Sequence, residues 1–246
     1  MKRLLSTTLA AAVLAATFAT GAISPAAAAP QASSQHTKSP GKADKQLAGE
    51  KRKVVSLIAG EDAALVRAIR ATNRAALTVG GAEVLANIDA DRLALAELKA
   101  AAQAATTVAD VRVVGAQATA VRPEIYSLVV NGLRQAARFQ VLVAQNTASI
   151  AVLGAAADAK ELEGFDVAAV REALTAATLA NGEAATLAAA ALAKGVLLTA
   201  FSTTVEREAF SADVAGAGAA LGVVDVHLQL AEDTLAAMVA VEEPVV

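Results

Sequence analysis

Residues 123–153 read PEIYSLVVNGLRQAARFQVLVAQNTASIAVL, and this stretch decides the expected fold. A set of polar positions recurs at steps of four, three, four and seven residues, which places them in one narrow strip along a helix. Nearly everything else is apolar, and a helix of this kind has to be covered on several sides. The stretch therefore predicts a central helix, with Pro123 in its first turn and other helices packed around it. The strip consists of Ser127, Asn131, Arg134, Arg138 and Gln145.

The composition of the whole chain also favours helices. Alanine occupies 68 of the 246 positions, whereas the only aromatic residues are Tyr126 and five Phe. Alanine is the best helix former, while strands draw on β-branched and aromatic residues for their packed faces. We therefore expect an all-α fold, an elongated bundle of five to six long, mostly antiparallel helices with coiled-coil-like packing. The absence of cysteine excludes disulfides, thiol nucleophiles and Cys-zinc sites.

Three helices are expected before the central one. The first has an apolar stripe that begins at Val54, and it ends near Thr78, because Gly80-Gly81 permits a turn. The second covers about 82–105, and so short a link makes the two antiparallel neighbours. Thr107, with Asp110 three positions on, nearly matches a capping box and predicts the start of a third helix. The expected buried stripes are Val54, Ile58, Leu65, Ile69 and Ala76 in the first helix, and Val84, Ile88, Leu95, Leu98 and Ala102 in the second.

Two further helices are expected after the central one. Residues 154–164 read as a polar connector, and Asp166 is a suitable N-cap for a helix over about 167–198. A break at 202–204 then precedes a helix whose apolar positions alternate steps of four and three, which predicts a packed seam. Three glycines in this helix are tolerable where a neighbour approaches closely. The seam consists of Phe210, Val214, Ala217, Leu221, Val224, Leu228, Ala231, Leu235 and Met238, and the glycines are Gly216, Gly218 and Gly222.

The N-terminus has the pattern of a cleaved secretory signal. Lys2-Arg3 precedes an apolar run, and small residues surround a cleavage site after Ala28. The alternative is a retained membrane anchor, because residues 4–23 are just long enough to span a bilayer. We expect residues 1–28 to be removed, residues 29–41 to form a disordered spacer, and residues 42–246 to form a single helical domain outside the cell.

A second apolar stretch raises the question of membrane insertion. Residues 139–157 carry no charge over 19 positions, close to the spanning length of about 20. Five polar side chains within the stretch would need partners in hydrocarbon, so a buried bundle helix is the preferred interpretation. After signal cleavage the chain is therefore not expected to be an integral membrane protein.

The charge distribution suggests possible partners. Residues 29–138 carry a net charge of +5 and residues 139–246 a net charge of −10. This asymmetry favours contacts between the two halves, either within one molecule or by self-association. The mature chain has a net charge of −5, and basic and aromatic residues are not interleaved, which argues against nucleic-acid binding.

A basic segment opens the expected helical domain. It would bind an anionic envelope polymer or lipid headgroups, or it is simply the solvated start of the first helix. Its members are Lys42, Lys45, Lys51, Arg52 and Lys53.

No catalytic, cofactor-binding or metal-binding residue is predicted. His36 lies in the spacer, and Asp225 precedes His227 by two residues, a spacing that points the two side chains in different directions on a helix. Tyr126 is expected to bury its ring and keep its hydroxyl at the surface, with a binding role as the alternative. Three carboxylate pairs are expected on solvated surface: Asp89 with Asp91, Glu206 with Glu208, and Glu242 with Glu243.

Two segments resemble a group of bacterial proteins. The stretch 111–142, with Arg122-Pro123-Glu124-Ile125-Tyr126 as its most distinctive motif, is similar to uncharacterised secreted, Ala-rich, long-helical proteins of high-GC Gram-positive bacteria. The stretch from Thr199 through the last helix also resembles them. The resemblance implies a helical fold and secretion, and it implies no activity, because the group has none assigned.

Two functions fit these observations. The first is a secreted, non-enzymatic helical scaffold or interaction protein associated with the cell envelope. The second is an extracellular carrier that binds an apolar ligand between helices, since pockets can open in helix bundles. An enzyme is not expected, and no cofactor is implied.

Overall fold

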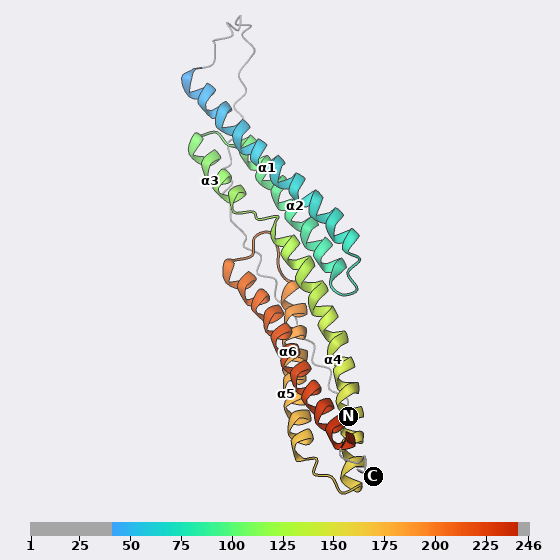
Figure 1. The fold of residues 1–246 in the computed structure, drawn as a ribbon. Helices are drawn as coiled ribbons and strands as arrows, with labels where there is room; N and C mark the ends of the chain where they lie inside the picture. The colour runs from blue at the N-terminus through green and yellow to red at the C-terminus, as the bar shows by residue number, and fades with distance from the viewer. Residues whose placement is uncertain (1–40, 241–246) are drawn as a thin grey trace, which may run out of the picture. The chain divides into compact units, whose positions relative to one another are not determined.

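The computed structural model describes residues 41–240, and the expected all-α bundle is confirmed there. Six helices pack against one another in this range, which contains no strand (Figure 1). The expected signal peptide and all of the expected spacer except Gly41 lie outside the described residues. The helices are α1 (Lys42–Ala75), α2 (Gly81–Ala104), α3 (Val108–Thr119), α4 (Ile125–Leu162), α5 (Ala168–Gly195) and α6 (Thr204–Ala240).

A tight turn joins α1 to α2, as the Gly80-Gly81 pair predicts. Helix α1 ends earlier than expected because Ala76 adopts a left-handed conformation, with φ 47°, and closes the helix. Gly80 also has a positive φ, 77°. A Cβ at Gly80 would lie 2.7 Å from Cγ1 of Val196, so both backbone freedom and space favour glycine there.

Helix α3 starts where its cap predicts. The side chain of Thr107 accepts a hydrogen bond from the amide of Asp110 at 3.2 Å. The helix ends at Thr119, before Arg122-Pro123. The amide of Arg122 donates to the carbonyl of Ala200 at 2.8 Å. Pro123 lies in the turn that follows, so the prediction that it starts the next helix is wrong by two residues.

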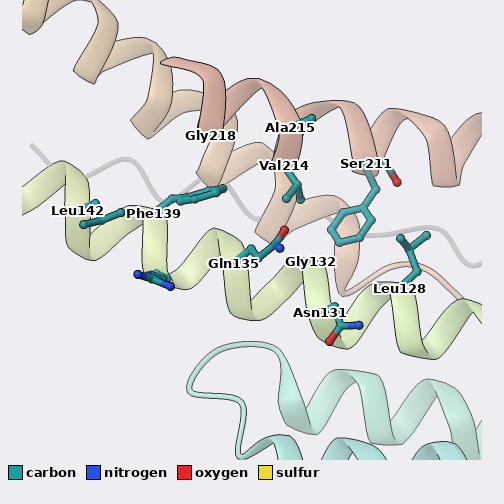
Figure 2. Close-up of a pocket in the computed structure, with 12 residues that line it drawn as sticks. Leu128, Asn131, Gly132, Gln135, Phe139, Leu142, Ser211, Val214, Ala215 and Gly218 are labelled. Carbon is teal, nitrogen blue, oxygen red and sulfur yellow. The ribbon is translucent and has the colours of Figure 1, made fainter. Parts of the chain in front are cut away.

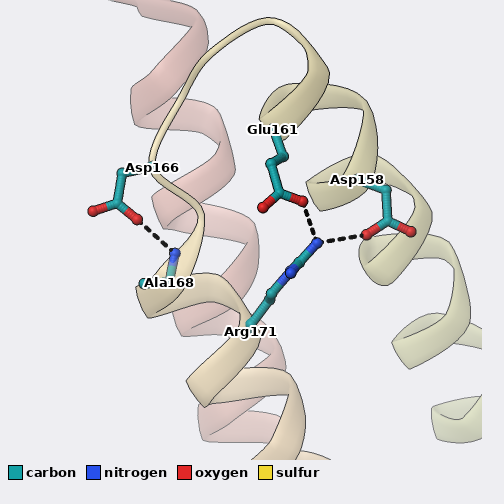
Figure 3. A network of polar contacts seen from close by, with 5 residues as sticks. All are labelled: Asp158, Glu161, Asp166, Ala168 and Arg171. Carbon is teal, nitrogen blue, oxygen red and sulfur yellow. Dashed lines mark hydrogen bonds and ion pairs between the residues drawn. The ribbon is translucent and has the colours of Figure 1, made fainter.

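The predicted connector over residues 154–164 is also wrong, because α4 continues through it to Leu162. Alanines keep the helix propensity high there, and the polar residues stabilise the helix end instead of breaking it. Arg171 of α5 forms ion pairs with Asp158, at 3.1 Å, and with Glu161 (Figure 3). The chain then turns at Gly164, which has a positive φ of 94°.

The N-cap of α5 is Val167, so the prediction that Asp166 is the N-cap is wrong by one residue, although the amide of Ala168 does donate to the Asp166 carboxylate at 2.9 Å (Figure 3). Helix α5 follows and ends at Gly195, three residues before its predicted end. At the next break, the amide of Glu206 donates to the hydroxyl of Thr203 at 3.3 Å, while the amide of Thr203 donates to the Glu206 carboxylate at 2.7 Å. This reciprocal capping box sets the start of α6.

Helix α4 takes part in two sets of contacts. Its first half belongs to a core shared with α1, α2, α3, the end of α5 and the start of α6, and its second half lies beside α5 and α6 (Figure 1). The larger core contains Tyr126, Leu133 and Phe210, and smaller clusters lie between the second half of α4 and the two last helices. The expected stripe of α1 is buried at Val54, Ile58 and Leu65, and that of α2 at Val84, Ile88, Leu95 and Ala102.

The central-helix prediction holds for only part of α4. Within residues 139–157 only Ala157 is buried, and Val141 and Val152 are 58% and 68% exposed. The expectation that this stretch is buried is wrong because α5 and α6 cover a single face of it. Ile125–Leu162 and Thr204–Met238 are long and apolar enough to cross a membrane by length and composition alone, which is weak evidence.

The predicted seam of α6 is confirmed as a buried face. Seven positions from Phe210 to Ala231 are buried, and Leu235 and Met238 are half-buried. A Cβ at Gly216 would lie 2.9 Å from Cδ1 of Leu187, which fits the expected close approach of a neighbouring helix. The same does not hold for Gly222, where a Cβ would meet nothing within 4 Å.

Leu228→Asp should destabilise the protein by about 3 kcal/mol or more, because it places a carboxylate in the core cluster between α5 and α6. Val226→Asp is the matched control, since Val226 lies on the same helix and is 66% exposed. It should change the free energy of unfolding by less than about 0.5 kcal/mol. Urea denaturation measures both, and equal midpoints for the two variants would show that the seam is not buried.

Candidate functional site

The largest cleft lined by two helices lies between α4 and the first half of α6 (Figure 2). It has a volume of about 660 Å³, within the range of about 300–1,000 Å³ found for ligand pockets. Five lining residues from α6 face seven from α4. They are Leu128, Asn131, Gly132, Gln135, Arg138, Phe139 and Leu142 of α4, and Phe210, Ser211, Val214, Ala215 and Gly218 of α6.

The lining of this cleft is mainly apolar. Its polar groups are two amides, one hydroxyl and the guanidinium of Arg138, and it contains no His, Asp, Glu or Lys. Proton transfer near neutral pH needs a group that titrates there, and the lining supplies none. The cleft therefore offers apolar contact, hydrogen bonds and one positive charge.

Two glycines let the ring of Phe210 pack at the base of the cleft. A Cβ at Gly132 would collide with this ring, and a Cβ at Gly195 would lie 2.8 Å from its Cε2. Phe210 is completely buried. The ring thus joins α4, the end of α5 and the start of α6, and the cleft opens beside this contact.

A buried polar network lies at the junction of α2, α4 and the link between α5 and α6. Oδ2 of Asp91 accepts a hydrogen bond from the hydroxyl of Tyr126 at 2.6 Å and from the amide of Ala200 at 2.7 Å. One turn earlier on α2, the amide nitrogen of Asn87 donates to the carbonyl of Val196 at 2.9 Å. These bonds attach α2 to the link that follows α5.

Two sequence predictions fail at this network. Asp91 is 4% exposed and Tyr126 is 1% exposed, so the carboxylate is not on solvated surface and the hydroxyl is not at the surface. The physical reason is that the Tyr126 hydroxyl donates a hydrogen bond to the Asp91 carboxylate inside the protein. This bond offsets the cost of burying the two polar groups. Their separation of 35 residues left no local sequence signal.

Burial changes the acidity of both groups. Desolvation raises the pKa of Asp91 above its ordinary value, and the hydrogen bonds from Tyr126 and Ala200 oppose this effect. The pKa of Tyr126 is also raised, first by burial and then by its bond to Asp91. The network has no opening in the α4–α6 cleft, whose lining includes neither residue. Tyr126 borders a different cavity, between α1 and the start of α4, although its side chain is buried.

The remaining candidates stay apart from one another. His227 is half-buried, and Asp89, Glu206 and Glu208 are exposed as expected. Hydrogen bonds from Thr203 lower the pKa of Glu206, which acts as a cap. His36, Glu242 and Glu243 lie outside the described residues. Within the described part of the chain, no three His, Asp or Glu side chains are grouped to hold a metal ion.

The basic segment forms the first turns of α1. The ammonium group of Lys51 donates to the carbonyl of Gln103 at 2.7 Å, and Lys53 pairs with Glu50 at 3.2 Å. Lys42, Lys45 and Arg52 are exposed and form no ion pair with any carboxylate among residues 41–238. This end of α1 therefore presents positive charge to solvent.

No family model, curated protein or solved structure matches this chain. The site has to be interpreted from its own geometry.

The stability of the folded protein should depend on the ionisation of Asp91. Because its folded pKa is raised above 3.8, the folded state keeps this proton while the unfolded state releases it. The stability of the wild type relative to Asp91→Asn should therefore be highest below pH 3.8, fall as the pH rises, and level off above the folded pKa. Denaturant unfolding of both proteins over this range measures the difference. A difference that is flat or rises with pH would contradict the burial of the charge.

Proposed function

We propose that this protein is an exported, non-enzymatic helical scaffold or interaction protein that associates with the cell envelope. The observation that carries this proposal is the exposed, unpaired positive charge of Lys42, Lys45 and Arg52 at the start of α1. A long-range electrostatic attraction to an anionic polymer needs only such accessible charges. The signal-like residues 1–28 support export.

The rest of the described chain is consistent with a protein that binds rather than catalyses. Its buried carboxylate, Asp91, serves a helix junction, and the lining of the α4–α6 cleft contains no His, Asp, Glu or Lys. Large apolar side chains are exposed along the second half of α4, and others are exposed on α2, α5 and α6, among them Leu93, Leu179 and Val226. The exposed half of α4 and the basic end of α1 are among the surfaces available to partners.

Attachment should be sensitive to salt. Full-length protein should stay with the secreting cells at low salt and be released at high salt, because surface charges are screened over about 10 Å at 0.1 M and about 3 Å at 1 M. Lys42→Gln/Lys45→Gln should shift release to lower salt. Lys99→Gln/Arg112→Gln removes two exposed charges from α2 and α3 and is the matched control.

Immunoblots of salt washes measure the release, and the intact mass of the released chain should correspond to a start at Ala29. Protein that is already free in the medium at low salt would overturn the attachment. So would release profiles that do not differ between the lysine variant and its control.

A second function is favoured by the α4–α6 cleft. Its apolar lining and volume suit a carrier of a small apolar ligand, in which the half-buried ring of Phe139 contacts the ligand and the amides orient it. This proposal does not require the basic end of α1.

Ala215→Trp should block such a carrier, since Ala215 lines the cleft and an indole would fill part of it. Ala212→Trp is the control, because Ala212 is exposed on the same helix and does not line the cleft. Mass spectrometry of organic extracts measures the lipid that co-purifies with each protein. The carrier function is supported when wild type and Ala212→Trp retain a stoichiometric lipid that Ala215→Trp lacks. Wild-type protein from which no lipid is extracted argues against the carrier function.

A further inference from the structure

The seam between α1 and the first half of α4 has a floor of small side chains. Along α1 the floor follows a helical stripe with steps of four, three and four residues, and each of its members is half-buried. Alanine side chains extend little beyond the backbone, so the seam stays open as a shallow groove. The floor consists of Ala64, Ala68, Ala71 and Ala75.

Arginines line both walls of this groove. Three lie on α1 at steps of three and four residues, and two lie on α4 four residues apart, so each set follows one face of its helix. All five are exposed. We call them the arginine groove: Arg67, Arg70 and Arg74 of α1, and Arg134 and Arg138 of α4.

Two cavities show which levels of α1 and α4 lie side by side, and a third lies on α1 alone. One of about 430 Å³ places Arg67 and Ala68 beside Ser127 of α4. Another of about 290 Å³ places Arg134 and Arg138 beside Ala75 and the turn after α1. A third, of about 570 Å³, is lined by the three arginines of α1 together with Asn73. The two helices therefore run in the same direction here. From the level of Ser127 to that of Arg138 the groove extends about 16 Å, at 1.5 Å per residue.

None of the five guanidinium groups forms an ion pair with a carboxylate among residues 41–238. Elsewhere in the same range, Arg92 pairs with Asp62 at 2.7 Å and Arg171 pairs with Asp158. Acidic residues outnumber basic ones in the chain, so partners were available. Five unpaired like charges on neighbouring helices repel one another, and an anionic ligand removes that repulsion.

The shape of the groove indicates the kind of anion. Guanidinium groups bind phosphate or carboxylate through paired N–H donors, and the arginines repeat along the groove instead of converging on one point. The floor itself is alanine, although the exposed Val79 and Val141 border the cavity at the Arg138 end, so lipid vesicles belong among the probes of the test. Glu61 and Glu124 border the cavity at the Ser127 end, so the basic part begins at Arg67 and continues toward Arg138.

We propose that the arginine groove binds an extended polymer that carries repeated phosphate or carboxylate groups. This inference deepens the proposed envelope association, on which it rests, by naming a second contact for the polymer beyond the basic start of α1. The polymer lies along the alanine floor, and its anionic groups alternate between the two arginine walls.

The test uses the full mature chain and two soluble probes, short-chain inorganic polyphosphate and poly-L-glutamate. Arg70→Gln/Arg134→Gln removes one guanidinium from each wall, and Lys99→Gln/Arg112→Gln removes two exposed charges elsewhere. Isothermal titration at several salt concentrations gives Kd and its salt dependence. The groove variant should lose about tenfold in affinity for the probe that binds and show a shallower salt slope, while the control stays within about twofold. Circular dichroism checks that both variants keep their helical content.

The outcomes separate this inference from the proposed function. Equal affinities for the groove variant and its control overturn the inference, and so does binding to anionic phosphatidylglycerol vesicles without binding to either polymer. If only Lys42→Gln/Lys45→Gln loses polymer binding, the groove is excluded while the envelope association stands. If neither probe binds and salt does not release the protein from cells, both proposals fail.

Discussion

The carboxylate of Asp91 is the contact on which the arrangement of the helices depends most directly. It receives one hydrogen bond from Tyr126 of α4 and one from the amide of Ala200 in the α5–α6 link. Three segments far apart in sequence thus meet at one buried oxygen. A buried carboxylate without both donors would be costly, so the network favours the single arrangement in which α2, α4 and the link are all in place. Asn87 reinforces the same junction from the preceding turn of α2.

Packing around this junction uses small residues where most helix bundles use large ones. The ring of Phe210 lies where Gly132 and Gly195 have no side chain, which lets α4, α5 and α6 converge on one aromatic group. In α5 most of the buried residues are alanine. Small side chains allow helix axes to approach toward the lower end of the range of about 8–10 Å. Each alanine buries little area, so the bundle depends on length and on many modest contacts.

Local sequence signals predicted the positions of the helices better than the contacts between them. The cap at Thr107 and the glycine turn before α2 are predicted from a few neighbouring residues, and the structure confirms both, while the predicted cap at Asp166 is displaced by one residue to Val167. The connector predicted after residue 153 failed because its charged residues pair with Arg171, across a turn that the sequence alone does not close. The burial of Asp91 was missed for the same reason, since its donors lie 35 and 109 residues away.

The periodicity of apolar residues also does not determine which apolar helix faces are covered by another helix. Residues 125–138 and 139–157 are both rich in apolar residues, yet the first stretch lies in a core shared with α1, α2, α3, α5 and α6, and the second is covered on one face. Length decides the difference, because α4 extends beyond α1, α2 and α3 (Figure 1).

This geometry brings the two candidate surfaces together at one residue. Arg138 lines both the α4–α6 cleft and the cavity at the end of the arginine groove. A positive charge at the border of an apolar cleft favours ligands with an anionic group near an apolar part, whereas the groove alone favours a polymer without one. The α4–α6 cleft and the arginine groove share the guanidinium of Arg138. A charged ligand bound at one of them therefore changes the electrostatic potential at the other. Binding at the cleft and binding at the groove are therefore expected to be coupled through charge, even where the helices themselves do not move.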